Sequence, residues 1–201
     1  MRFVAGLCGA WISWAPTHLG ALTLGANQFI CYVLVPRLAE SPRAAGIGEG
    51  CGLTVTGAAL VLLPGTLLTL PSSWLAAPLE RRLGTRTALV GGLVLAAAGG
   101  LLLAVRHGQL WQVVLCYLVA SVGYGFAMAA LPRLVNQASP VEHSGSANGV
   151  NTVARVLGGA IGSQLGAAVL TGAGGFGTAF GLAAGVAAVG GVLALFAGAR
   201  G

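Results

Sequence analysis

The sequence has very little charge. Only 7% of its 201 residues are charged, lysine and aspartate are missing altogether, and all ten strongly basic residues are arginines. Soluble domains contain about 25% charged residues, whereas hydrophobic residues make up 56% of this chain. The composition therefore excludes an ordinary water-soluble fold and predicts a protein that resides in the lipid bilayer.

Sequence motifs for catalysis and cofactor binding are also missing. The chain contains no Walker A sequence, no H-E-x-x-H, no G-x-S-x-G and no pair of aspartates in an apolar segment. The cysteines show no C-x-x-C or cysteine–histidine spacing, so we interpret them as small packing residues. They are Cys8, Cys31, Cys51 and Cys116. We expect no enzyme activity, no cofactor and no metal site.

Six apolar stretches organise the chain. Each has about 20 residues or more, the length of helix that crosses about 30 Å of hydrocarbon. The sequence thus predicts an all-α integral membrane bundle over residues 16–199, preceded by a lead-in over residues 1–15. The expected helices cover residues 16–35, 52–76, 87–105, 110–131, 146–170 and 176–197.

Two apolar segments affect the number of expected helices. The uncharged run 156–199 is too long for one crossing, and the sequence G-A-G-G at residues 172–175 predicts a hairpin there. The apolar segment 3–14 mimics a secretory signal, but Pro16 and His18 follow it instead of a clear cleavage site. We expect it to lead into the first helix.

The arginines predict the orientation in the membrane. The net charge of +6 comes from scattered arginines with no run longer than two, which favours a topology signal over a nucleic-acid partner. Alternate loops are unequal: one side would carry Arg2, Arg81, Arg82, Arg86, Arg133 and Arg200, and the other Arg37, Arg43 and Arg106. Because basic residues stay on the cytoplasmic side, we expect both termini in the cytoplasm and the bundle in the cell membrane.

The spacing of the expected helices suggests internal symmetry. Long connections follow the first and the fourth helix, at residues 38–50 and 135–145, and the other turns are shorter. Two groups of three helices that enter the membrane from opposite sides are typical of a 3+3 inverted repeat.

One connection resembles a known transporter motif. Segment 77–86, A-P-L-E-R-R-L-G-T-R, resembles the cytoplasmic G-x-x-x-D-R-x-G-R-R loop of the major facilitator superfamily. Arg82, Gly84 and Arg86 match the pattern, Arg81 stands where the acid is expected, and Glu80 is one residue away. The resemblance implies that these five residues belong to a gating loop.

Further stretches are similar to bacterial drug:proton antiporters of that superfamily. Residues 123–132, 139–145 and 149–162 are similar to their helices ten and eleven, and residues 35–46 to their external loop between helices seven and eight. The resemblance covers nearly all of the chain from residue 16 onward. It implies helices seven to twelve, the C-terminal half of an exporter of small, drug-like molecules.

The fifth expected helix has two different faces. At 100° per residue, one side is polar or small and the other is aliphatic, so the first must face protein or water. The polar residues are candidates for a substrate cavity: Asn148, Asn151, Thr152 and Arg155. Gly158, Gly162 and Gly166 form a small-x-x-x-small series that we interpret as helix packing.

Polar side chains within expected spans leave two interpretations open. Arg155 is the one charge inside a span, and it serves either as a cavity residue that attracts an anionic group or as a structural arginine that reaches carbonyls or the interface. Asn27, Gln28 and Tyr32 of the first helix either line a cavity or form interhelical hydrogen bonds. No glutamate lies clearly inside a span, so an acid for proton coupling has to come from elsewhere.

Two functions remain in view. The chain is either one six-helix part of a secondary-active exporter, facing a second bundle across a small-molecule substrate cavity, or a non-transporting interaction or assembly protein or truncated fragment. In the first case its partners are lipid and a second bundle, which is an N-terminal half or a second copy. Six similar helices encoded in a neighbouring reading frame would favour the first.

Overall fold

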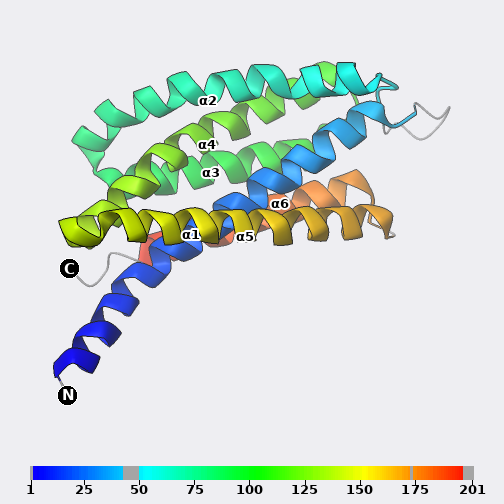
Figure 1. Ribbon diagram of the computed structural model, residues 1–201. Helices are drawn as coiled ribbons and strands as arrows, with labels where there is room; N and C mark the ends of the chain where they lie inside the picture. Colours follow the sequence, from blue (N-terminus) through cyan, green and yellow to red (C-terminus); the bar gives the residue numbers. More distant parts are fainter. Residues whose placement is uncertain (1, 43–49, 173, 197–201) are drawn as a thin grey trace.

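The computed structural model describes residues 2–42, 50–172 and 174–196, which fold into six long α-helices and one short 3₁₀ helix (Figure 1). No strand occurs in these ranges, as the composition predicted. The elements are α1 Arg2–Glu40, α2 Val55–Leu83, α3 Thr85–Val105, α4 Leu110–Ala138, η1 Val141–His143, α5 Ser144–Thr171 and α6 Gly175–Phe196.

The six helices are long and apolar enough to cross a membrane. The spans begin at Thr17, Val55, Thr85, Leu110, Val141 and Gly175, and each has 21 residues or more. Large apolar side chains lie on the outside, as in Leu63, Leu67 and Leu70 of α2, where water would not stabilise them. The chain is therefore a multi-pass membrane protein.

Three helices extend well beyond their expected ranges, and the others agree with them to within two residues at each end. α1 already starts at Arg2, so the expected lead-in is continuous with the first span. α2 runs to Leu83 and α4 to Ala138, seven residues further than the sequence suggested in each case. Charges in α2 and Pro132 in α4 suggested that these helices end earlier. The two segments contact each other through Glu80 and Arg133, and both continue as helix. Segment 77–83, which was expected to be a loop, is therefore helical.

All but one of the connections between helices are short. A single residue, Gly84, separates α2 from α3, and its φ of 87° lies in the region that favours glycine. η1 fills most of the connection between α4 and α5, so only the connection between α1 and α2 is long. α5 ends at Thr171 and α6 begins at Gly175, which places a helix break in the segment expected to form a hairpin.

The packing of the helices has a repeated pattern. α1 packs mainly against α5 and α6, while α4 packs mainly against α2 and α3, and α3 also packs against α6. Exchanging the first three helices for the last three leaves this pattern unchanged, which is the relationship expected for two three-helix repeats. The fold is thus an all-α bundle of six long helices in two three-helix groups.

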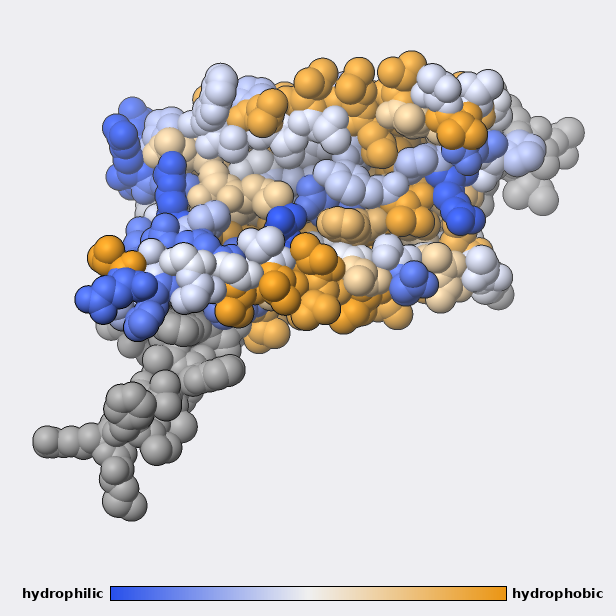
Figure 2. All heavy atoms as spheres, in the orientation of Figure 1, coloured by the Kyte–Doolittle hydropathy of each residue, from blue (hydrophilic) through white to orange (hydrophobic). Residues whose placement is uncertain are grey.

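On one side of the bundle, two central helices, α1 and α4, lie between two flanking helices, α2 and α5. In Figure 1, α2 and α5 form opposite edges of the view, and α1 and α4 cross between them, with α3 and α6 further back. We call this side the open face. Figure 2 shows pale and blue residues along its middle and orange residues along the edges formed by α2 and α5. Polar residues that could form a site therefore gather along the middle of the open face.

Candidate functional site

Main-chain contact between α1 and α5 anchors the site. A Cβ atom built on Gly25 would lie 1.9 Å from the carbonyl oxygen of Arg155, and one built on Gly158 would lie 1.9 Å from that of Leu22. Such distances show that only glycine permits this approach of the two helices. The α-carbon of Arg155 is thus held against α1.

The rest of the glycine series lies along the same contact. A Cβ on Gly162 would meet the carbonyl oxygen of Ala26 at 2.4 Å, and one on Gly166 would meet the side chain of Ile30 at 3.2 Å. The structure therefore places the small-x-x-x-small series against α1, where a larger side chain would push the helices apart.

The polar residues of α5 lie on the flank of the helix that turns toward α4. Asn148 donates from Nδ2 to Oδ1 of Asn136 in α4 over 2.6 Å, and Thr152 bonds within its own helix to the carbonyl oxygen of Asn148. Asn151 is only 5% exposed, and its Oδ1 atom has no hydrogen-bond partner among the described residues. A buried amide oxygen without a donor is rare in folded proteins and needs an explanation.

Arg155 lies on the same flank and is partly exposed. Its guanidinium forms no hydrogen bond or ion pair with any residue in the described ranges. Arg155 lies about 16 Å along α5 from Ser144, at about 1.5 Å per residue. The structure therefore places an uncompensated cation well inside a span, where charge costs at least about 2.5–3.5 kcal/mol.

The polar residues expected on α1 separate into two groups. Gln28 is buried and donates from Nε2 to the hydroxyl oxygen of Tyr32 over 2.9 Å, while its Oε1 atom has no partner in the described structure. Asn27 is 0% exposed and lies behind this pair, between α4 and α6. Gln28 and Tyr32 remain cavity candidates, whereas Asn27 does not reach the surface.

The sequence did not identify the partners of Asn27. Its Oδ1 atom accepts a 2.7 Å hydrogen bond from the hydroxyl of Tyr124, and its Nδ2 atom donates over 2.6 Å to the carbonyl oxygen of Ala183. A tyrosine inside an apolar span is itself a signal that a partner exists, because its hydroxyl must be satisfied. Nothing in the sequence pattern shows that the partner is Asn27.

The five candidates near Gly84 do not form one cluster. Glu80 is buried in α2, with 4% of its side chain exposed, and forms an ion pair with Arg133 of α4, whose side chain is 48% exposed. Arg81 and Arg82 are exposed, and Arg86 donates from Nε to the carbonyl oxygen of Ala194 in α6 over 2.9 Å. Arg133 is a residue that the motif did not indicate.

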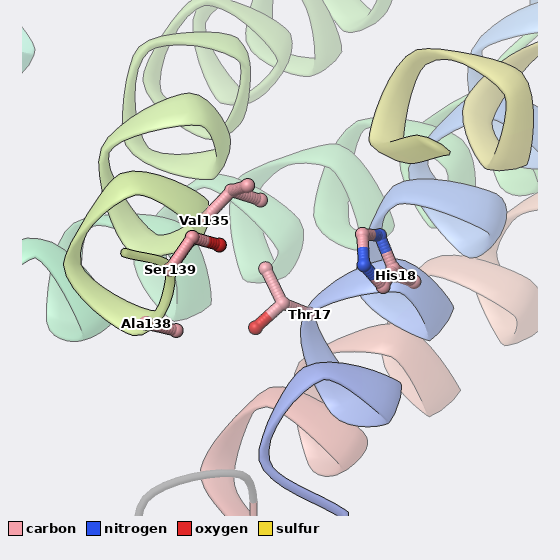
Figure 3. Close-up of a pocket in the computed structure, with 5 residues that line it drawn as sticks. All are labelled: Thr17, His18, Val135, Ala138 and Ser139. Carbon is pink, nitrogen blue, oxygen red and sulfur yellow. The ribbon is translucent and has the colours of Figure 1, made fainter. Parts of the chain in front are cut away.

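A narrow crevice lies near the same end, between α1 and α4 (Figure 3). Thr17 and His18 of α1 line it together with Val135, Ala138 and Ser139. It has no room for even one water molecule, so it is not a substrate site. Within the described ranges no three histidine, cysteine or acidic residues lie close enough to hold a metal ion.

Comparison with known proteins identifies a matching family model. The family model described as Major Facilitator Superfamily matches residues 17–200, which is nearly the whole chain. No curated protein matches the chain.

Proposed function

The chain belongs to the major facilitator superfamily of membrane transporters, and on that premise we propose that it is the C-terminal six-helix bundle of a secondary-active exporter of small molecules. The open face would form one wall of the substrate path. One observation carries this assignment: Gln28, Asn151 and Arg155 all keep unpaired polar groups on α1 and α5.

The amide oxygens of Gln28 and Asn151 are buried, whereas the side chain of Arg155 is partly exposed and lipid cannot solvate it. An unsatisfied polar group costs several kcal/mol in hydrocarbon, and a cation at bilayer depth faces water, an anion or another protein surface. The opposite flank of α5 differs, because Val150, Leu157 and Ile161 are exposed there and suit lipid contact. The distribution supports a path that is lined on one side only by this bundle.

A second six-helix bundle supplies the other wall in this proposal. Alternating access in such transporters arises when two bundles rock against each other around a site near the bilayer midplane. The second bundle is either a first-half bundle or a second copy of this one, which would pair the open faces across a symmetry axis. Export of drug-like molecules follows from the resemblance of residues 123–162 to drug:proton antiporters.

Coupling to protons would depend on the second bundle. Among the described glutamates, Glu40 ends α1, Glu80 is paired near Gly84, and Glu142 lies in η1 between two spans. None of these three lies in the middle of a span, so the described part of the bundle offers no carboxylate to take up a proton within the path. We propose that the bundle lies in the cell membrane. In the proposed orientation the end of the bundle at Gly84 and both termini face the cytoplasm.

Reconstitution tests the proposal. The 201-residue chain would be purified and placed in liposomes with an imposed pH gradient, with and without a co-expressed first-half bundle, and efflux of carboxyfluorescein and ethidium would be followed. We expect gradient-driven efflux only with the second bundle. The same liposomes without a pH gradient serve as the control.

Gradient-driven efflux by liposomes that contain this chain alone would contradict the need for a first-half bundle. Absence of transport in both preparations, with stable association of the two bundles, would favour a non-transporting membrane protein.

A further inference from the structure

We infer that Arg155 binds an anionic group, a carboxylate or a phosphate, that enters the open face from outside this bundle. The inference rests on the proposed function and names the chemistry of its substrate path. Its basis is a main chain held against α1 at residue 155 and a guanidinium with no counter-ion in the described structure.

No described carboxylate is available to neutralise Arg155. Glu80 is already paired with Arg133 near Gly84. Glu40 is the last residue of α1, far from the contact between Gly25 and Arg155. Glu142 lies in η1, about four helical turns before Arg155 in the chain. Because none of the described carboxylates pairs with Arg155, we assign its anion to a substrate or to a second bundle.

The N–H groups of Arg155 also donate to no neutral acceptor in the described structure. Two buried amide oxygens, those of Gln28 and Asn151, lack donors, and still the guanidinium bonds to neither. Arg155 thus keeps its full set of five N–H donors. A planar guanidinium with free donors matches the two oxygens of a carboxylate or phosphate in a bidentate pair.

The direction of Arg155 follows from its neighbours on α5. Asn148, seven residues earlier, reaches Asn136 of α4, and a Cβ on Gly159, one turn later, would meet the ring of Phe29 in α1 at 2.7 Å. Positions 148, 155 and 159 lie on one flank of the helix. That flank faces the space between α5 and the two central helices, so the charge points toward the open face and not toward α6.

The main chain around Arg155 is fixed. Its carbonyl oxygen lies against Gly25, with no room for even a methyl group between them. α5 cannot rotate at this point without separating from α1, so the Cα–Cβ bond of Arg155 keeps its direction relative to α1. The side chain beyond it can still turn to meet an anion.

Binding in detergent tests the inference without any transport. The purified chain would be titrated into carboxyfluorescein, an organic anion, and into ethidium, an organic cation, and fluorescence anisotropy would report binding. We expect Arg155→Gln to raise the Kd for carboxyfluorescein at least tenfold and Arg155→Lys to raise it about threefold, because lysine keeps the charge and loses the fork. Ethidium binding should not weaken.

Arg106→Gln is the matched control, because Arg106 is exposed at the end of α3 and its loss changes the net charge equally. It should leave carboxyfluorescein binding unchanged. Equal weakening by Arg106→Gln and Arg155→Gln would overturn the inference, since net charge alone would then explain the binding. Unchanged binding in Arg155→Gln, with correct folding shown by the thermal unfolding curve, would also overturn it.

Vesicle transport by the complete two-bundle protein distinguishes the two sources of the anion. If the substrate carries it, Arg155→Gln lowers carboxyfluorescein transport and spares ethidium transport. If a carboxylate of the second bundle carries it, transport of both dyes falls together and the two bundles separate more easily in detergent. Both outcomes support the inference.

The inference and the proposed function fail separately. Arg155-dependent carboxyfluorescein binding with no transport of either dye would refute the transport function and leave the anion site intact. Full transport by Arg155→Gln, with unchanged anion binding and unchanged assembly, would refute the anion site and leave the transport function intact.

Discussion

Asn27 and Tyr124 form a fully buried hydrogen bond between two helices, in which the tyrosine hydroxyl donates to the asparagine Oδ1 atom over 2.7 Å. Both residues are 0% exposed, and they lie on α1 and α4. The amide nitrogen of Asn27 extends the contact to the carbonyl oxygen of Ala183 in α6. Two side chains thus connect three helices.

Removing the tyrosine hydroxyl should destabilise the bundle. Tyr124→Phe leaves Oδ1 of Asn27 buried without a donor, and we expect a loss of about 1–2 kcal/mol in unfolding free energy. A double-mutant cycle with Asn27→Ala, measured by unfolding in mixed detergent micelles, checks the cause. Tyr124→Phe should cost much less when Asn27 is already alanine. Equal costs in both backgrounds would show that the hydrogen bond contributes nothing.

The ion pair of Glu80 and Arg133 should respond asymmetrically to mutation. Arg133→Gln leaves a carboxylate unpaired in a site where 4% of the side chain is exposed, whereas Glu80→Gln leaves a half-exposed arginine. Because burying an unpaired charge is costly and partial exposure reduces that cost, we expect Arg133→Gln to lose about 1–3 kcal/mol and Glu80→Gln clearly less. Arg81→Gln, at an exposed neighbour, should change stability by less than about 0.5 kcal/mol. The reverse order of the two variants would argue against a buried Glu80.

Two glycines of the same helix should behave in opposite ways. Gly158→Ala places a methyl group 1.9 Å from the carbonyl oxygen of Leu22 and should destabilise the bundle by more than about 2 kcal/mol, because α5 must move away from α1. Gly149→Ala meets nothing within 4 Å and should stabilise α5 by about 0.5–1 kcal/mol. Thermal unfolding in detergent compares them. Similar shifts for both variants would mean that α1 and α5 are not in main-chain contact.

The orientation predicted from the arginines can be tested by labelling. In a cysteine-free background, single cysteines at positions 82 and 143 should react only with reagents that enter the cell, and those at 43 and 174 with impermeant reagents outside. Arg82, His143 and Gly174 lie at helix ends, where a cysteine is accessible, and residue 43 lies outside the described ranges. External labelling at both 82 and 143 would reverse the topology.

The length of the apolar stretches allowed the number and type of helices to be predicted. The ends of α2 and α4 were predicted too early, because charges and a proline usually mark helix ends. Here Glu80 finds Arg133 on the neighbouring helix, so a charged segment can continue as helix. That compensation depends on tertiary contact and is invisible in the local pattern.

The candidate site was predictable in composition but not in arrangement. The polar flank of α5 follows from helical periodicity, whereas the burial of Asn27 does not, because an amide within a span suits a cavity and an interhelical bond equally well. The contact between Gly25 and Arg155 shows a second limit. A glycine series indicates that some helix approaches closely, but it does not identify that helix.

The hydrogen bond from Asn27 to Ala183 also sets a waiting time during biosynthesis. The two residues are 156 positions apart in the chain. At about 5–20 residues per second, a ribosome needs on the order of ten to thirty seconds to synthesise the chain between them. During that interval the Nδ2 atom of Asn27 lacks its acceptor on α6, and Gly25 stays uncovered until α5 has been made. The main packing contacts of α1 therefore form only after the last two helices have been synthesised.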